Sequence, residues 1–216
     1  MMSLRYALIF GVTSVLFFAS CKDKPKLLIY GHREATTVKH PDGTTSIDTV
    51  YQTISDFSFL NQDSTIINNA TFKDKIYIAD FFFTTCPSIC PIMHRNMKTI
   101  YDDYKENPDV MFLSHTIDYK YDKPSVLKKY AEKLGVDGKK WEFAYGTKDA
   151  VYKLAETAYL SSVIEDSKVA GGYVHQGYFI LVDKDRHIRG LYDGTNDEAV
   201  AQLKKDIPVL LAEYKQ

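Results

Sequence analysis

The sequence predicts an α/β fold in which a mixed sheet is covered by helices on both faces. The runs Ile76–Phe83 and Val110–Ile117 are almost continuously apolar, which is typical of strands buried on both faces. Apolar residues at helical spacing follow each run. Two later apolar runs, Tyr173–Val182 and His187–Tyr192, are separated by Asp183-Lys184-Asp185-Arg186, which predicts a hairpin. The alternation of strands and helices indicates parallel strands, and the terminal hairpin adds antiparallel ones.

The composition is that of one ordinary globular domain with room for a targeting segment. The chain has 216 residues, and its 27 Lys and Arg nearly balance its 28 Asp and Glu. A chain with this balance has no global basic field for nucleic acid. Three cysteines are too few for a disulfide-dense scaffold. The sequence has no phosphate-cradling glycine loop and no serine nucleophile elbow, which disfavours nucleotide binding and serine hydrolysis.

Residues 1–20 have the pattern of a secretory signal peptide. Arg5 gives a positive start, and the apolar run Ala7–Ala19 would span roughly 20 Å as a helix, too short for a bilayer core of ~30 Å. The sequence Leu16-Phe17-Phe18-Ala19-Ser20-Cys21 is similar to a bacterial lipobox, in which the cysteine is lipidated. We therefore expect a membrane-anchored lipoprotein of the bacterial cell envelope that faces the periplasm, with its lipid on Cys21. The alternative is an uncleaved membrane anchor with an incidental cysteine.

Residues 21–50 are expected to connect this segment to the main domain, residues 51–216. Lys22–Lys26 is polar and contains Pro25, as expected of a tether. Val38–Val50 is centred on Pro41-Asp42-Gly43, which predicts a hairpin. Phe57–Leu60 and the polar residues after it predict a strand and a turn.

Four helices are predicted from helix-start residues that precede apolar residues at helical spacing. These starts are Pro91, Pro124, Thr147 as an N-cap, and the capping box Thr195-Asn196-Asp197-Glu198. A short strand, Glu142–Tyr145, separates the second helix from the third. Gly135 ends the second helix, and Pro208 is expected to kink or end the last one.

The segment Thr84–Pro91 (TTCPSICP) contains the candidate redox-active or metal-binding residues. It places Cys86 and Cys90 at the first strand-to-helix turn, which makes the predicted fold thioredoxin-like. The two sulfurs can form a disulfide or hold one soft metal ion, and a helix N-terminus favours the thiolate. Zinc is disfavoured because a structural zinc site takes four protein ligands. Two thiols with one imidazole suit monovalent copper. The alternative is an ordinary short-range disulfide in an exported domain.

Six histidines compete for the place of a third ligand. We expect surface positions for His32, His40 and His187, and a packing role for His115 in its buried strand. His94 continues the step of four from Cys86 and Cys90, but Pro87 and Pro91 oppose one continuous helix there. His175 follows Gly171-Gly172, a flexible approach to a strand. The residues alone do not decide whether His94 or His175 is the third ligand.

Three blocks of sequence resemble the signature blocks of the Sco/SenC family. They are DFFFTTCPSICP, SHTIDYKYDKP and GGYVHQGYFILVDKDRHIRGLYDGT, and the similarity runs from Ile54 to the C-terminus. That family consists of membrane-anchored, thioredoxin-fold copper-binding proteins that act in the assembly of cytochrome c oxidase. The resemblance implies that Cys86, Cys90 and His175 ligate copper, and it gives His94 no such role. We expect the cofactor to be copper, as Cu(I) and also as Cu(II).

Two departures from the family pattern concern residues around the ligands. Tyr119 follows Asp118 where family members often carry Pro, and Gln176 follows His175 where Ser is common. Asp118 and Asp122 match the family; we expect either turn formation and helix capping, or a role in redox tuning or docking. Met93 and Met97 are soft donors near the motif, but their helical spacing with Ile100 predicts core packing.

Three functions are compatible with these residues. The first is a copper chaperone that delivers copper to the binuclear copper centre of cytochrome c oxidase, with the copper-bearing subunit or another copper protein as its partner. The second is a thiol–disulfide oxidoreductase that keeps the oxidase cysteines reduced, with Cys86 attacking and Cys90 resolving. The third is an exported binding module with a structural disulfide.

Overall fold

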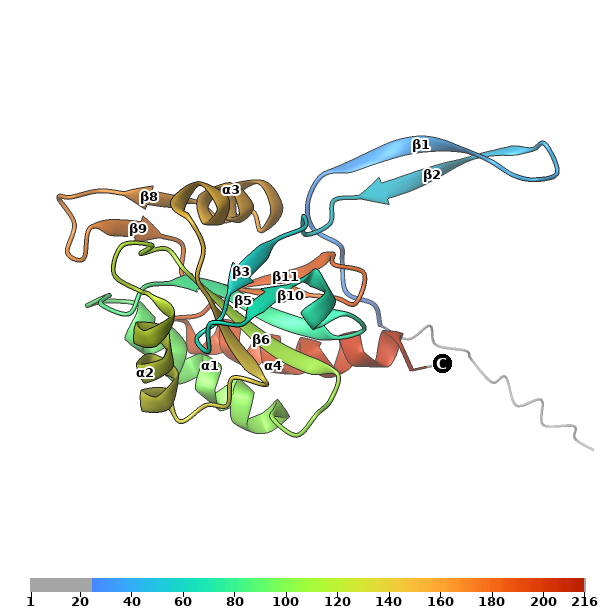
Figure 1. Cartoon of the computed structure of the whole chain (residues 1–216). Helices are drawn as coiled ribbons and strands as arrows, with labels where there is room; N and C mark the ends of the chain where they lie inside the picture. Colours follow the sequence, from blue (N-terminus) through green and yellow to red (C-terminus); the bar gives the residue numbers. More distant parts are fainter. Residues whose placement is uncertain (1–24, 216) are drawn as a thin grey trace, which may run out of the picture.

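The computed structural model describes residues 25–215, and its centre is a five-stranded mixed sheet of order β11-β10-β5-β6-β7 (Figure 1). The strands are β5 (Ile76–Phe82), β6 (Val110–Thr116), β7 (Trp141–Ala144), β10 (Tyr178–Val182) and β11 (Ile188–Asp193). Strands β5, β6 and β7 are parallel, whereas β10 runs antiparallel to both β5 and β11. The predicted thioredoxin-like mixed sheet with an N-terminal hairpin is confirmed.

Helices cover both faces of this sheet. They are α1 (Cys90–Tyr104), α2 (Pro124–Leu134), α3 (Lys148–Ala158) and α4 (Asp197–Glu213). Figure 1 shows α1, α2 and α4 on one side and α3 on the other. Every residue of β5 and β6 is buried, because helices exclude water from both faces of these central strands. The continuous apolar runs in the sequence therefore correspond to the centre of the core.

The predicted strand Tyr173–Val182 is wrong as a single element. Its first part forms β9 (Tyr173–His175), which pairs with β8 (Val163–Glu165), a strand that the sequence analysis missed. Its second part is β10 of the main sheet. The break lies at Gly177, whose carbonyl accepts a hydrogen bond from Gly194 N (2.7 Å). The β8–β9 hairpin lies outside the main sheet, beside its carboxyl end (Figure 1).

The helix starts and stops agree with the sequence except in α4. Thr147 accepts from Ala150 N (3.4 Å) at the start of α3, and Gly135 ends α2 with a left-handed φ of 65°. The N-cap of α4 is Asn196 rather than Thr195, and its side chain accepts from Ala199 N (2.9 Å). The helix continues through Pro208 to Glu213. One lost N–H is tolerated there because the flanking apolar residues are buried in the core.

The N-terminal part contains the predicted hairpin, formed by β1 (Arg33–Lys39) and β2 (Thr45–Tyr51) around residues 41–43. It projects from the domain and is almost entirely exposed (Figure 1). The domain also contains a small pair, β3 (Ser58–Leu60) and β4 (Ile66–Asn68), followed by the short 3₁₀ helix η1 (Asn69–Phe72). The expected signal peptide, residues 1–20, and the lipidation site Cys21 lie outside the described residues.

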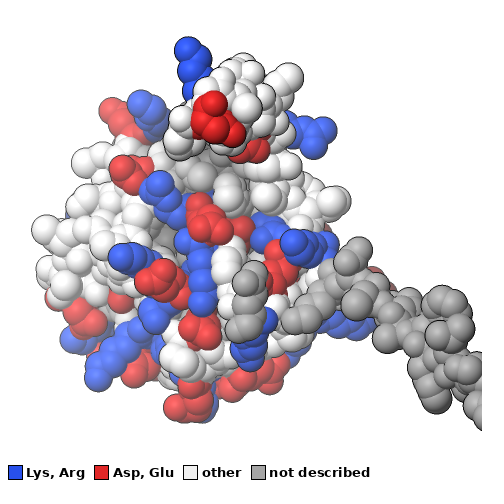
Figure 2. Space-filling model, turned by 90° about the vertical axis from the view of Figure 1, so that its right-hand side faces the viewer, with Lys and Arg blue, Asp and Glu red and all other residues white. Residues whose placement is uncertain are grey.

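The segment before the hairpin is attached to the start of β11. The guanidinium of Arg189 donates to the carbonyls of Leu27 (2.6 Å) and Leu28 (3.2 Å) and forms an ion pair with Glu213 of α4. Figure 2 shows that basic and acidic side chains are interspersed on this side of the molecule. Within residues 25–215, no helix is long and apolar enough to cross a membrane.

Candidate metal centre

Cys86, Cys90 and His175 meet at the carboxyl end of β5. Cys86 lies in the turn after β5, Cys90 is the first residue of α1, and His175 is the last residue of β9. The Nε2 atom of His175 lies 3.4 Å from Cys90 Sγ. One donor atom from each residue lies within 4.8 Å of the other two. Two segments that are far apart in the sequence therefore present two sulfurs and one nitrogen to a common point.

Local backbone bonds position the sulfurs. The backbone N–H of Cys86 donates to Phe83 O (3.2 Å), which closes the turn after the strand. Helix α1 begins with Pro91 in its first turn, where a missing N–H costs no hydrogen bond. Both cysteines are buried and both are free thiols. The pair is thus placed between a core strand and a helix N-terminus, as predicted, although Cys86 lies outside the helix.

A groove of about 250 Å³ connects Cys86 and His175 to solvent. Its walls come from the cysteine turn and from the β8–β9 hairpin, and they combine apolar side chains with the polar Ser88. Gly171 brings the hairpin close to the turn. Its φ is +89°, and a Cβ at this position would lie 2.8 Å from the Phe83 ring. Only glycine permits this backbone conformation and this distance together.

The two thiols differ in their affinity for a proton. The hydrogen bond from Cys90, supported by His175 and by backbone N–H groups, lowers the pKa of Cys86 from 9.0 to about 3. The hydrogen bond with Cys86, together with burial, raises the pKa of Cys90. One proton between the sulfurs therefore resides on Cys90, and Cys86 is a thiolate at neutral pH. A thiolate is the form that binds metals and attacks disulfides.

Asp122 fixes the turn that carries Cys86. This buried carboxylate accepts hydrogen bonds from Thr84 N (2.9 Å), from the Thr84 hydroxyl and from Thr116 Oγ1 (2.6 Å). Burial raises the pKa of Asp122. The expected helix-capping role of Asp122 is wrong, because Lys123 is the N-cap of α2 and makes no side-chain cap bond. Asp122 instead holds the residue two positions before Cys86.

Asp118 holds the strand that carries His175. Its carboxylate accepts from the N–H groups of Lys120 (3.2 Å) and Tyr121 (3.0 Å), which confirms the expected turn. It also accepts from the hydroxyl of Tyr173 (3.0 Å), a residue that the sequence analysis missed. Tyr173 lies two positions before His175, so both side chains are on the same face of β9. That spacing is the signal that could have identified Tyr173.

His94, the competing candidate, points into the core and away from the thiols. Its Nε2 lies 2.9 Å from Asp80 Oδ2, and its Nδ1 lies 2.7 Å from Tyr130 Oη. Asp80 also accepts from Ser114 Oγ (2.5 Å). His94 is thus satisfied by a buried polar network under α1, and it is not brought to the sulfurs.

The remaining donors mostly lie where the sequence predicts. Met93 and Met97 are fully buried in the core, and so is His115. His32 and His40 are exposed. His187 was expected to be exposed, but its side chain is only 20% exposed, and its Nδ1 lies 3.4 Å from the buried carboxylate of Asp183.

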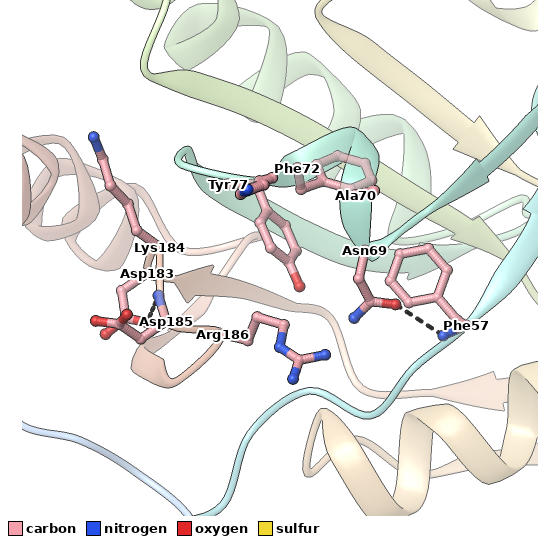
Figure 3. Close-up of a pocket in the computed structure, with 10 residues that line it drawn as sticks. Phe57, Asn69, Ala70, Phe72, Tyr77, Asp183, Lys184, Asp185 and Arg186 are labelled. Carbon is pink, nitrogen blue, oxygen red and sulfur yellow. Dashed lines mark hydrogen bonds between the residues drawn. The ribbon is translucent and has the colours of Figure 1, made fainter.

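A second group of donors and a larger cavity lie at the opposite end of the sheet. Donor atoms of Asp183, Asp185 and His187 also lie within 4.8 Å of one another. Asp183, however, is engaged by Arg189 (3.1 Å) and by the N–H groups of the β10–β11 turn. The neighbouring cavity, of about 410 Å³, is shown in Figure 3; its Asn69 accepts from the backbone N–H of Phe57. These contacts explain the position of Asp183 by turn structure and ion pairing.

Comparison with known proteins agrees with this geometry. A family model described as SCO1/SenC matches residues 46–208. The "SCO1 protein homolog" of Bacillus subtilis (strain 168) is 28% identical over 155 residues, which are 71% of this chain and 80% of that protein. The crystal structure of a SCO1/SenC family lipoprotein from Bacillus anthracis str. Ames gives a TM-score of 0.68 at 28% identity, covering 74% of this chain and 95% of that one.

The fold is shared with a copper-bound structure. Bradyrhizobium japonicum ScoI with copper bound gives a TM-score of 0.59 at 20% identity, covering 70% of this chain and 97% of that one. At this identity the likeness shows the fold alone. The family model, however, spans most of the chain, including both cysteines and His175. The chain therefore belongs to the SCO1/SenC family.

Proposed function

We propose that this protein binds copper through Cys86, Cys90 and His175 and passes it to the binuclear copper centre of cytochrome c oxidase. The observation that carries the proposal is the convergence of two sulfurs and one imidazole nitrogen within 4.8 Å. The copper-bearing oxidase subunit is the proposed acceptor, and another copper protein is the alternative acceptor. Membership of the SCO1/SenC family supports the choice of metal and of pathway.

The donor set fits copper better than zinc. Soft thiolates select Cu(I), and Cu(I) tolerates low coordination. A structural zinc site takes four protein ligands, and the group at the groove offers three. The low pKa of Cys86 makes one sulfur available as a thiolate without a preceding proton loss. Binding to Cys90 would release its proton, so copper affinity should fall as the pH is lowered.

Transfer would proceed by exchange of ligands between the two proteins. The groove gives an acceptor cysteine a path to Cys86, whereas Cys90 is 1% exposed. His175 lies on a separate hairpin, so its bond to copper can break while α1 and β5 stay in place. Each sulfur of the acceptor would then replace one donor of this chain, so copper never becomes free in solvent.

We also propose that the chain is lipidated on Cys21 and faces the periplasm from a membrane of the cell envelope. The position of the N-terminal tether supports an orientation in which the metal centre points away from the membrane. Tyr30 pairs with Ile188 at the start of β11, whereas Cys86 follows the end of β5 that is near the last residue of β11. The metal centre is thus at the end of the sheet away from the tether. Anchoring would raise its effective concentration near a membrane-bound acceptor. Labelling with a radioactive fatty acid tests this, because Cys21→Ser should abolish incorporation.

The copper proposal is tested by metal stoichiometry and affinity in the full chain. Cys86→Ser, Cys90→Ser and His175→Ala should each weaken Cu(I) binding, because each removes one donor. His40→Ala is the matched control, since His40 is exposed and lies on the projecting hairpin region. Unchanged affinity in all three donor variants would refute the proposal.

Thiol–disulfide exchange is a second candidate function, which the difference between the two thiols favours. The Cys86 thiolate would attack a target disulfide and release one target thiolate. Cys90, after losing its proton to solvent, would attack the mixed disulfide and release the second. The target is reduced by two electrons, and Cys86 and Cys90 become a disulfide. His175→Ala separates the functions: it should lower copper affinity but leave reduction of an oxidised target peptide largely intact.

A further inference from the structure

The hairpin that carries His175 is held to the domain by few polar contacts. Among residues 25–215, two polar side-chain contacts outside the metal centre join β8 and β9 to the rest of the domain. The hydroxyl of Tyr173 donates to Asp118 (3.0 Å), and Glu165 forms an ion pair with Lys148 (3.1 Å). Both members of that ion pair are about one-third exposed, so water screens it. The hydrogen bond of Tyr173 is therefore the better defined of the two contacts.

The acceptor of this hydrogen bond is rigid. Asp118 is 8% exposed, and two backbone N–H groups of its own turn fix its carboxylate. Its backbone N–H donates to Thr116 Oγ1 (3.1 Å), and that hydroxyl in turn donates to Asp122 (2.6 Å). Asp122 holds Thr84, close to Cys86. One loop, residues 116–122, thus contacts both halves of the metal centre.

We propose that Tyr173 is a positioning residue that keeps His175 at the thiols and thereby sets how long copper stays bound. This inference rests on the proposed copper-binding function. The Tyr173 ring packs against Phe83 at 5.1 Å between centroids, and the hydroxyl reaches past it to Asp118. Because β9 is only three residues long, a hydrogen bond made by its first residue, Tyr173, also fixes the position of its last residue, His175.

The effect on copper follows from the population of the closed hairpin. Copper bound by two sulfurs gains its third bond only while His175 is in place. Loss of the Tyr173 hydroxyl lowers the fraction of molecules in that arrangement, and the apparent affinity falls by the same factor. Residues that orient metal ligands typically change metal affinity about 10- to 100-fold when mutated. The sulfurs would keep their positions, because Asp122 and α1 hold them.

The test compares Tyr173→Phe with Tyr178→Phe in the full chain. Both variants remove one hydroxyl, but the Tyr178 side chain is 37% exposed and makes no side-chain hydrogen bond within residues 25–215. Transfer of Cu(I) to a chelator gives the dissociation rate. We expect Tyr173→Phe to release copper about 10-fold faster, and Tyr178→Phe to release it at the wild-type rate. Electron paramagnetic resonance of the Cu(II) form should show a smaller fraction of copper with imidazole nitrogen in Tyr173→Phe.

A double-mutant cycle shows whether the hydroxyl acts through His175. In a His175→Ala background, Tyr173→Phe should no longer change the rate of copper release. An equal acceleration with and without His175 would overturn the proposal, and so would a wild-type rate in the single variant.

Hydrogen exchange of the metal-free protein separates this inference from the proposed function. Tyr173→Phe should speed exchange of the amides of β8 and β9 and leave those of β5 unchanged. This change in exchange is expected even if the protein fails to bind copper. A failure to bind copper would refute the proposed function but not the role of Tyr173 in holding the hairpin. Unchanged exchange in β8 and β9 would refute the role of Tyr173 even if all three donors bind copper.

Discussion

Replacing His115 by phenylalanine should stabilise the protein, and the gain should grow as the pH falls. The imidazole is fully buried among aromatic rings, and within residues 25–215 neither of its nitrogens has a hydrogen-bond partner. A buried polar group without a partner costs about 1–3 kcal/mol. Phenylalanine removes that cost, although the larger ring has to fit against Phe81, whose centroid is 5.1 Å away. We expect a net gain of about 1 kcal/mol near neutral pH.

The pH dependence follows from the ionisation of the imidazole. Burial lowers the pKa of His115 from 6.5 to about 3. Between these two values the unfolded chain binds a proton that the folded protein does not, so the wild type loses stability as the pH falls below 6.5. The loss amounts to about 2 kcal/mol between pH 7 and pH 5, at ~1.4 kcal/mol per unit of pKa. His115→Phe cannot take up this proton and should keep that stability.

Urea unfolding of the reduced protein at pH 7 and pH 5 measures both quantities. The advantage of His115→Phe over the wild type should increase by about 2 kcal/mol between the two conditions. His40→Phe serves as the control, because it removes an exposed imidazole from the projecting hairpin and leaves the core unchanged. A difference that does not change with pH would show that His115 can ionise inside the fold, and the argument from burial would be wrong.

Two further predictions concern the metal centre. Gly171→Ala should destabilise the closed hairpin and weaken copper binding more than Gly172→Ala does. Both positions have positive φ, but an added Cβ would lie 2.8 Å from Phe83 at Gly171 and has nothing within 4 Å at Gly172, so thermal unfolding and copper affinity of the pair isolate the clash. Alkylation by iodoacetamide, followed by mass spectrometry of the reduced protein, should modify Cys86 before Cys90 and should persist near pH 5, because the pKa of Cys86 is about 3. Alkylation rates of Cys86 and Cys90 that are equal and decline together below pH 9 would contradict the sharing of one proton between the two sulfurs.

The parts of the fold that the sequence predicts well are those fixed by local or strongly periodic signals. Strands β5 and β6 are buried on both faces, so their burial produces continuous apolar runs. The cap at Thr147 and the stop at Gly135 depend on bonds within a few residues. Pro208 shows the limit of such rules, because the burial of its neighbours outweighs the bond that the proline removes.

The parts that the sequence could not predict depend on partners far along the chain. The run from Tyr173 to Val182 reads as one strand because both of its parts are apolar, yet the parts pair with different strands. The position of Asp122 in the sequence predicts a helix cap, but its hydrogen-bond partner Thr84 is 38 residues away. Tyr173 and Asp118 are separated by 55 residues. No sequence pattern within a few residues of either partner predicts such hydrogen-bonded pairs.

The family resemblance favoured His175 over His94, and the start of helix α1 explains in physical terms why His94 is not at the sulfurs. A step of four aligns Cys86, Cys90 and His94 only if one helix contains all three. Helix α1 begins at Cys90, so Cys86 is outside it, and the His94 ring is engaged by Asp80 in the core. His175 could only be placed by the family resemblance, because it approaches the sulfurs from an independent hairpin.

The three donors are held with unequal firmness, and this difference bears on how copper could leave. The sulfurs follow a fully buried strand and open a helix, and the hydrogen bonds of Asp122 fix their turn. His175 is on a two-stranded hairpin whose outward side chains, Ile164 and Val174, are 58% and 44% exposed. Elements with few buried contacts open at a lower free-energy cost than the core does. If copper is exchanged as proposed, release of His175 would disturb the donor that is held least firmly, and the two sulfurs would keep the ion until an acceptor cysteine reached the groove.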